Sequence, residues 1–425
     1  MTDRSSDNLL QVPVDELRPG MFVAELDRPW LETPFALQGF YVRDAVDIDD
    51  LRKHCAHVFV DFTAPPPHAD AEAPIPPIRS RPMTLWQRIV AWLRGRLPRV
   101  ERDDDSDGVV SFVAELPNAR RAVDAASTAL RDAIGRVGEG QPLDVKVVRS
   151  AVETVVDSLL RNKDAVAALV RMRKVDDYTY QHALATSVWA VLLGRHLGLD
   201  RDALMDLGLG GALLDLGKSR MPSDLLSRPA ALEEDDWAVM RMHVEIALEL
   251  IEDSTETNEN IEAMIATHHE RHDGSGYPHG IVGTAIPVFG RIAGIADSYD
   301  AMISRRPWAA AVSSFAAMRE LQGLADSHFQ AEMVEQFMQA IGSFPAGTLV
   351  ELSTGEVAIV IAENAARRLR PKVMLILDEH KRPRDRNLII DLYRPDAQGS
   401  KGAGAYILHG LEAGAYDIDA ESFFL

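Results

Sequence analysis

Cysteine is almost absent from this sequence. Cys55 is the single one among 425 residues, so an internal disulfide is excluded and a reducing compartment is favoured. No uninterrupted apolar run reaches the roughly 18 residues that are needed to span a bilayer. The stretch from Met1 to Asn8 is polar and of mixed charge, unlike a secretory signal. These absences predict a cytoplasmic protein.

The chain also has fewer basic than acidic residues. The chain holds 45 Lys and Arg residues against 65 Asp and Glu residues, which gives a formal net charge of −20. Such a chain repels nucleic acids and lacks the broad basic surface of a DNA- or RNA-binding protein. We therefore expect neither DNA nor RNA as a partner. An anionic substrate can bind only where metal ions or a few cations reverse the local field.

The remaining composition is that of a globular protein long enough for several domains. Residues 9 to about 62 read as short strands, with CAHVFVDF as a strong strand candidate. Apolar residues recur at helical spacing from about 110 to 340, and a period of two appears from Gly347 onward. The predicted fold is mainly α: a helical bundle with small β-rich units at both ends.

These patterns divide the chain into five segments. They are a β-rich N-terminal accessory domain (1–62), a proline-rich linker with a basic amphipathic helix (63–109), a helical connector (110–165), the main helical domain (166–345) and a β-rich C-terminal unit (346–425). Within the linker, residues 84–97 read TLWQRIVAWLRGRL. Such a helix can lie on a membrane surface or dock on the body of the protein, and the apolar stripe favours docking.

Histidines and aspartates interrupt apolar helix faces at several places in the helical region. A single histidine on such a face is more often a satisfied core residue than a ligand. Six such groups are harder to explain that way, because buried charges need partners and a divalent cation is an efficient one. Mixed imidazole and carboxylate ligands suit Fe, Mn, Zn or Ni better than Ca or Mg. On spacing alone, a metal site and ordinary core residues are equal alternatives for His182, Asp215, His243, His268, His269 and Asp297.

A longer motif shifts this balance. Residues 268–280 read HHERHDGSGYPHG, and the paired histidines, the Asp-Gly step and the Gly-Tyr-Pro run resemble the signature of HD-GYP domains, a branch of the HD phosphohydrolase superfamily. ALLDLGK resembles the family's His-Asp block, and Asp297 with Asp300-Ala301 resembles its closing aspartate helix. The resemblance covers about residues 170–340. More loosely, residues 9–62 resemble the N-terminal domain that often precedes such domains in bacterial proteins.

The resemblance implies a metal-dependent activity. Family members hold two metals, sometimes three, and use metal-activated water to hydrolyse cyclic di-GMP to linear pGpG or GMP. Fe or Mn is the expected metal here, with one or two ions per chain. One implied site consists of Asp215, His243, His268 and His269, and the other of His182, Asp297, the bridging Asp215 and the histidine that precedes it.

That preceding histidine is missing from this chain. The block reads LLDLGK where the family expects LHDIGK, so Leu214 occupies the ligand position. A leucine has no lone pair for a metal, and we expect the site to be weakened by more than the roughly 10–100-fold that follows the loss of a supporting partner. Tyr178 occupies the position of a glutamate found in trinuclear members, which argues against a third metal.

The implied substrate contacts are incomplete. Lys218 resembles the lysine that meets the scissile phosphate, and Arg306 matches a contact to the second phosphate, although either can be an ordinary helix-end cation. Ala309 stands where many members have another cation, so the grip on the substrate is expected to be reduced. Tyr277 and Pro278 would shape the loop over the site.

Three functions are compatible with the sequence. The first is a cyclic di-GMP phosphodiesterase with a weakened site, the second is an inactive sensor of cyclic di-GMP or of a partner protein, and the third is a scaffold. Leu214 discriminates between the first two, because catalysis in the family needs both ions. By family analogy, a diguanylate cyclase domain bound through the Gly-Tyr-Pro loop is a candidate partner, and a homodimer is a candidate assembly.

Overall fold

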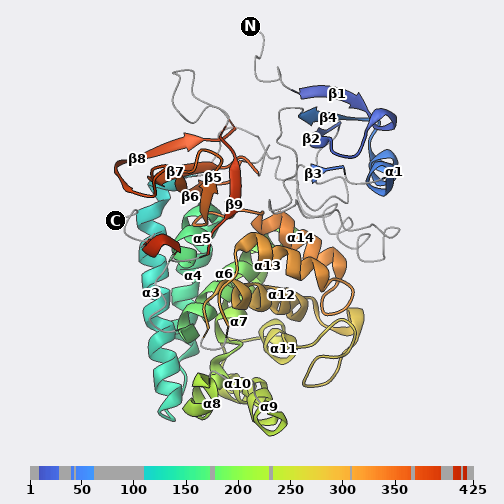
Figure 1. Ribbon diagram of the computed structural model, residues 1–425. Helices are drawn as coiled ribbons and strands as arrows, with labels where there is room; N and C mark the ends of the chain where they lie inside the picture. Colours follow the sequence, from blue (N-terminus) through green and yellow to red (C-terminus); the bar gives the residue numbers. More distant parts are fainter. Residues whose placement is uncertain are drawn as a thin grey trace. The chain divides into compact units, whose positions relative to one another are not determined.

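The computed structural model describes most of the chain and is mainly helical, with a small antiparallel sheet near each end (Figure 1). This confirms the predicted fold class. The predicted basic helix at 84–97 lies outside the described residues. The described residues are 9–27, 40–42, 45–61, 110–172, 178–228, 233–306, 309–364, 369–393, 405–412 and 415–418.

The N-terminal sheet is built from four antiparallel strands in the order β1-β4-β2-β3. Its core is a set of small apolar residues, with Val23, Val58 and Val60 fully buried beside Leu51 of the helix α1. The predicted strand in CAHVFVDF is confirmed as β4. The elements are β1 (Leu9–Pro13), η1 (Val14–Glu16), β2 (Phe22–Leu26), β3 (Phe40–Tyr41), α1 (Ala45–His54) and β4 (His57–Asp61).

The helical unit begins with a long antiparallel hairpin. Helix α3 (Phe112–Gly138) starts after the N-cap Ser111, and α4 (Val145–Arg161) starts after the N-cap Asp144, whose carboxylate accepts a hydrogen bond from Val147 N–H. These helices, together with α5 (Lys163–Met172), belong to the same compact unit as the helices that follow. The helical character expected of residues 110–165 is confirmed, and their separation from the main domain stays a prediction.

The remaining helices complete the bundle, whose centre is aromatic. The Trp189 indole and the Tyr299 ring meet edge to face at 5.5 Å, and Tyr299 meets Phe337 in the same way at 5.1 Å. All three side chains are fully buried. The elements are α6 (Tyr178–Leu197), α7 (Arg201–Leu213), η3 (Leu216–Arg220), α8 (Ser223–Ser227), α9 (Glu234–Arg241), α10 (His243–Ile251), α11 (Glu259–Thr267), η4 (Gly283–Ala285), α12 (Val288–Ile303), α13 (Ser314–Gly323) and α14 (Ala331–Ile341).

The C-terminal sheet has five antiparallel strands in the order β8-β7-β6-β5-β9. The central strands read as near-continuous apolar runs and are buried, whereas Leu388 and Ile389 on the edge strand β8 are partly exposed. Among the described residues, no helix combines the length and apolarity needed to cross a membrane. The strands are β5 (Leu349–Leu352), β6 (Val357–Ala362), β7 (Lys372–Leu377), β8 (Pro383–Asp391) and β9 (Ile407–Gly410).

A buried ion pair fastens the α3–α4 hairpin. The Glu115 carboxylate is fully buried and accepts a hydrogen bond of 2.8 Å from Ser158 Oγ. Arg161 donates to the same carboxylate through Nε and Nη2, at 3.0 and 2.8 Å. Since a buried carboxylate is costly without such donors, the three side chains fix the start of α3 against the end of α4.

We expect Glu115→Ala to lower the free energy of unfolding by about 2 kcal/mol, because the buried Ser158 hydroxyl and the Arg161 guanidinium lose a charged acceptor. Urea unfolding followed by helical circular dichroism measures the loss. Glu153→Ala is the control, since it removes an exposed ion pair with Arg201, and such pairs contribute little. Equal losses in the two variants would contradict this account of the hairpin.

Candidate metal centre

The six predicted ligand side chains converge in the structure. They form two groups that share Asp215, and in each group the potential ligand atoms lie within 4.8 Å of one another. The first group adds His243, His268 and His269, and the second adds His182 and Asp297. Every member except His269 is buried, and His269 is partly buried. Residues far apart in the sequence are thus brought to one point of the bundle.

Each ligand is placed at a helix or at its end. His182 lies near the start of α6 and Asp297 near the middle of α12. Asp215 lies between α7 and η3, and His243 is the first residue of α10. His268 is the C-cap of α11, and His269 follows it. Five separate elements (α6, the α7–η3 turn, α10, α11 and α12) pack together, as the ribbon in Figure 1 shows. Each of them delivers a polar side chain to an apolar interior.

The turn after Asp215 packs directly against α10. A Cβ at Gly217 would lie 2.0 Å from the carbonyl oxygen of His243 and 2.9 Å from the backbone nitrogen of Ala247. Only glycine leaves room for this approach. The Gly in LLDLGK therefore has a structural reason, since it allows α10 to hold His243 beside Asp215.

Hydrogen bonds orient two of the histidines. Nδ1 of His243 donates to the carbonyl oxygen of Met240 at 2.6 Å, and Nδ1 of His268 donates to that of Ile265 at 2.7 Å. Each Nε2 is left as the lone-pair atom, and each points to Asp215, with 3.4 and 3.8 Å to Oδ1. This is the arrangement that fixes the tautomer of metal-binding histidines.

Two buried polar atoms in the first group lack a hydrogen-bond partner among the described residues: Oδ1 of Asp215 and Nε2 of His269. An unpaired buried carboxylate oxygen and an unpaired imidazole nitrogen are both costly. A cation placed among the four donors would satisfy both at once. The residues present therefore fit a divalent transition metal.

The electrostatics keep two imidazoles of the first group, those of His243 and His269, neutral. Burial lowers the pKa of His243 to about 4, with the Lys218 ammonium as the next largest cause. Burial likewise holds the pKa of His269 well below its ordinary value. Burial alone would raise the pKa of Asp215, but Lys218, whose Nζ lies 2.6 Å from Oδ2, and the nearby histidines lower it well below the usual range. An anionic carboxylate beside neutral imidazoles is the charge state that metal ligation requires.

The second group is organised differently. Nε2 of His182 lies 2.9 Å from Oδ1 of Asp297 and 3.6 Å from Oδ2 of Asp215, and Nδ1 lies 2.7 Å from Oδ2 of Asp300. Burial acts to lower the pKa of His182, but the hydrogen bonds to Asp297 and Asp300 outweigh it and raise the pKa to about 10. Asp300 also accepts a hydrogen bond of 3.0 Å from Trp189 Nε1, so it holds the ring of His182 in place.

Comparison with known families agrees with this geometry. Residues 159–333 match the family model described as an HD domain. The helical unit contains an HD domain. Residues 9–148 match a domain of unknown function, and residues 349–395 match a KOW domain associated with the HD domain. The resemblance deduced from the His-His, Asp-Gly and Gly-Tyr-Pro motifs is confirmed, and HD phosphohydrolases are metal-dependent.

Relatives of this HD domain include named enzymes. A cyclic di-GMP phosphodiesterase from Pseudomonas aeruginosa is 27% identical over 388 residues, which cover 91% of this chain and 89% of that protein. A cyclic di-GMP phosphodiesterase response regulator from Xanthomonas campestris is 37% identical over 151 residues, or 35% of this chain and 40% of that protein. A solved HDG"Y"P protein from Bdellovibrio bacteriovorus is 14% identical, with a TM-score of 0.45 over 77% of this chain and 98% of that protein.

Leu214 is fully buried immediately before Asp215, at the C-terminal end of α7, where its N–H donates to the carbonyl oxygen of Gly210. Its side chain has no donor atom, so the second group of this HD domain offers three protein ligands where the first offers four. This is the asymmetry expected from the sequence. The side chain of Tyr178 lies outside the described side chains, so the expectation of no third metal stays a prediction.

The Gly-Tyr-Pro loop contacts His269 and the residue that follows it, Glu270. The ring of Tyr277 stacks on that of His269, with centroids 4.6 Å apart and planes at 28°, and Tyr277 N–H donates to the carbonyl oxygen of His269. The buried carboxylate of Glu270 accepts hydrogen bonds from the N–H groups of His279 and Ile281, at 2.8 and 2.9 Å. Sequence reasoning overlooked Glu270, although an acidic residue directly after the histidine pair was a visible signal.

The two predicted substrate-binding cations, Lys218 and Arg306, lie in different surroundings. Lys218 is held by its ion pair with Asp215 and is a quarter exposed. Arg306 pairs with Ala309 through reciprocal backbone hydrogen bonds of 2.9 and 3.2 Å, so the two residues form a tight turn after α12. Asp273 caps a turn by accepting a hydrogen bond from Ser275 N–H at 2.9 Å.

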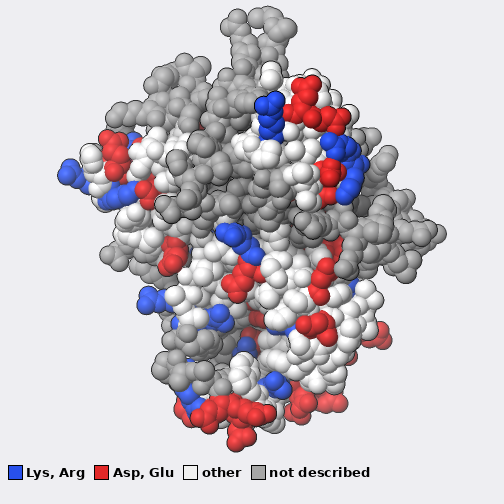
Figure 2. Space-filling model, turned by 45° about the vertical axis from the view of Figure 1, so that its right-hand side comes forward, with Lys and Arg blue, Asp and Glu red and all other residues white. Residues whose placement is uncertain are grey.

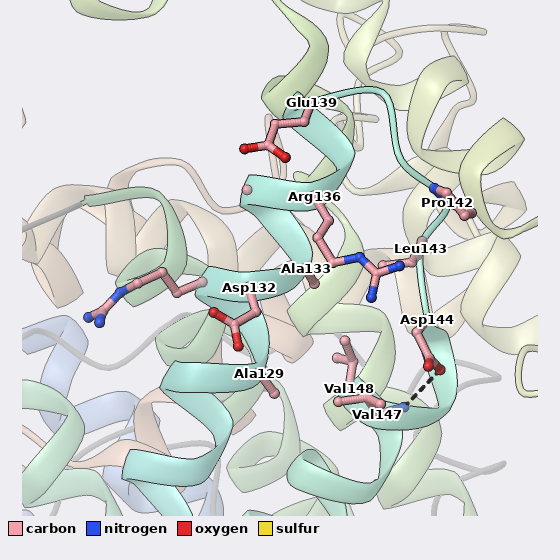
Figure 3. Close-up of a pocket in the computed structure, with 12 residues that line it drawn as sticks. Ala129, Asp132, Ala133, Arg136, Glu139, Pro142, Leu143, Asp144, Val147 and Val148 are labelled. Carbon is pink, nitrogen blue, oxygen red and sulfur yellow. Dashed lines mark hydrogen bonds between the residues drawn. The ribbon is translucent and has the colours of Figure 1, made fainter.

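A separate hollow of about 420 Å³ lies between the end of α3 and the start of α4. Figure 3 shows Arg136 reaching across it toward Leu143, and the hydrogen bond from Val147 N–H to the Asp144 cap. Its lining residues include none of the predicted ligand or substrate-binding residues. The hollow is therefore distinct from the metal centre.

We expect Gly217→Ala to weaken metal binding by about tenfold or more, because the added methyl group separates His243 from Asp215. Calorimetric titration of metal-free protein with Mn²⁺ measures the affinity. Gly135→Ala is the matched control, since no atom lies within 4 Å of a Cβ at that helical position, and its affinity should equal that of the parent. Equal Mn²⁺ affinity in the parent and Gly217→Ala would contradict the proposed role of this close approach.

Proposed function

We propose that this protein is a metal-dependent cyclic di-GMP phosphodiesterase of the HD-GYP type whose turnover is weakened by Leu214. The observation that carries the proposal is the first group, in which a buried carboxylate oxygen and a buried imidazole nitrogen lack partners beside the Lys218 ammonium. The names of the relatives from Pseudomonas and Xanthomonas support the choice of substrate. In this hydrolysis the water oxygen forms a new P–O bond, the P–O bond to one sugar oxygen breaks, and that leaving oxygen takes a proton from the water.

The ligand chemistry indicates which ion would bind. Asp215, His243, His268 and His269 would hold it, and neutral imidazoles with one carboxylate favour Fe or Mn over Mg or Ca. Such an ion supplies a Lewis acid that polarises the phosphate and lowers the pKa of water. We propose one ion in this group and a sparsely occupied second group.

The side chains of the chain itself would perform the remaining tasks. Lys218 brings an ammonium to the edge of the site, where it can compensate charge on the scissile phosphate. Tyr277 closes one side by stacking on His269. Asp and Glu side chains gather at the lower end of the visible face, so the few local cations are needed to attract an anionic dinucleotide (Figure 2). Arg306 is proposed as a contact to the second phosphate.

A sensor without turnover is the alternative function. It is favoured by the burial of Leu214 at the place of a ligand and by the engagement of His182 with two carboxylates. A site with one ion retains binding energy for a phosphate but loses the second ion that stabilises charge in the transition state. Hydrolysis assays separate the two functions.

We also propose a location and partners for the protein. The single cysteine supports a cytoplasmic location. Val282, which follows the Gly-Tyr-Pro loop, is 61% exposed, and this supports a protein contact by the loop with a diguanylate cyclase domain. A homodimer is a further candidate assembly.

The central test is hydrolysis by the full chain purified without oxygen and supplied with Mn²⁺ or Fe²⁺. We expect cyclic di-GMP to bind and to be converted slowly to pGpG or GMP, as measured by chromatography of the products. Asp215→Ala should abolish both metal retention and turnover, because Asp215 belongs to both groups. Binding without products would favour the sensor, and neither binding nor products would overturn the proposed function.

Leu214→His should restore the missing ligand. We expect metal content to rise from one toward two ions per chain and the initial rate to rise by about tenfold or more, because His182 and Asp297 are already in place. Elemental analysis and initial rates measure the two quantities. Leu216→His is the matched control, since it adds an imidazole on the other side of Asp215 and should restore neither. A parent that already hydrolyses at the variant's rate would show that Leu214 is tolerated.

A further inference from the structure

Arg241 is an exposed arginine at the edge of the metal centre. It is the last residue of α9, a helix that contributes no buried residue to the core. Its guanidinium carbon lies 5.2 Å from the centroid of the Tyr277 ring. Among the described residues, no carboxylate lies within ion-pair distance of Arg241. Exposed arginines elsewhere, such as Arg52 and Arg201, are paired with acidic neighbours.

The Tyr277 ring connects Arg241 to the first group of ligands. The ring stacks on that of His269, and its centroid lies 6.5 Å from that of the His243 ring, with the two planes at 82°. The cation is therefore one aromatic ring away from two ligands. In a chain of net charge −20, an unpaired cation at this place points to an anionic or electron-rich ligand.

The chemistry of a cyclic dinucleotide supplies such a ligand. When one phosphodiester lies at the metal group, the other phosphate and its guanines need contacts of their own. By the family resemblance, Ala309 stands where many members have another cation, and it offers only a methyl group. A guanidinium can donate two parallel hydrogen bonds to a phosphate or to O6 and N7 of guanine, and an aromatic ring can stack on a base.

We propose that Arg241 binds the half of the cyclic dinucleotide that is not being cleaved, next to the ring of Tyr277. This inference rests on the proposed function and adds a substrate-binding residue to it. We expect Arg241 to act on affinity and specificity, because the Tyr277 ring lies between it and the ligands His269 and His243. An arginine there that merely supports the tyrosine ring would leave substrate affinity unchanged.

The test compares Arg241→Ala and Arg241→Lys with the parent in the full, metal-loaded chain. We expect Arg241→Ala to raise the Kd and the KM for cyclic di-GMP by at least about tenfold, with kcat within about twofold and metal content unchanged. Arg241→Lys should recover part of the affinity if phosphate is the contact and little of it if guanine is the contact. Arg121→Ala, an exposed arginine of α3, is the control and should match the parent.

A second probe identifies the contact. If Arg241 meets the phosphate, Arg241→Ala should lose equal affinity for cyclic di-GMP and cyclic di-AMP, and if it meets guanine, the loss should be confined to cyclic di-GMP. Unchanged Kd and KM, a loss of kcat alone, or a loss of bound metal in Arg241→Ala would each overturn the inference while leaving the proposed function intact. A parent chain that binds no cyclic dinucleotide would overturn the proposed function, and this inference with it.

Discussion

The Asp215 carboxylate is buried where two groups of ligands meet, and the rest of the site is arranged around its charge. Oδ1 faces His243 and His268, whereas Oδ2 accepts from Lys218 and faces His182. A buried carboxylate is costly unless cations or donors surround it. The helix ends that converge here supply them, and this demand explains why an apolar bundle contains so many polar side chains at one point.

Backbone packing positions the ligand side chains around Asp215. Gly217 lets the turn after Asp215 touch α10, and backbone carbonyls at the ends of α9 and α11 set the tautomers of His243 and His268. These contacts do not depend on an ion. The donors are therefore largely preorganised, and metal binding need not pay for ordering them.

The two halves of the site differ in a way that bears on function. In the first group burial lowers the pKa of His243 and His269, and Oδ1 of Asp215 and Nε2 of His269 lack hydrogen-bond partners among the described residues. In the second group His182 is engaged by Asp297 and Asp300, and Leu214 offers no metal-binding atom. The first group has unpartnered atoms that an ion could bind, whereas the charges of the second group are paired with one another. This asymmetry is the structural basis of our proposal that turnover is weakened.

The sequence by itself determined the fold class, the six ligand candidates and the missing histidine, because apolar periodicity and a long motif are local properties of the chain. It did not reveal that Asp300 supports His182, that Glu270 fastens the Gly-Tyr-Pro loop or that Arg241 faces Tyr277. Each of these roles is a contact with a residue that is distant in the sequence or on another element, and spacing along the chain carries no record of it. The tertiary structure decided them, together with the division of the ligands into a four-donor and a three-donor group, because only the packing of α6, α7, α10, α11 and α12 fixes which oxygen of Asp215 faces which histidine.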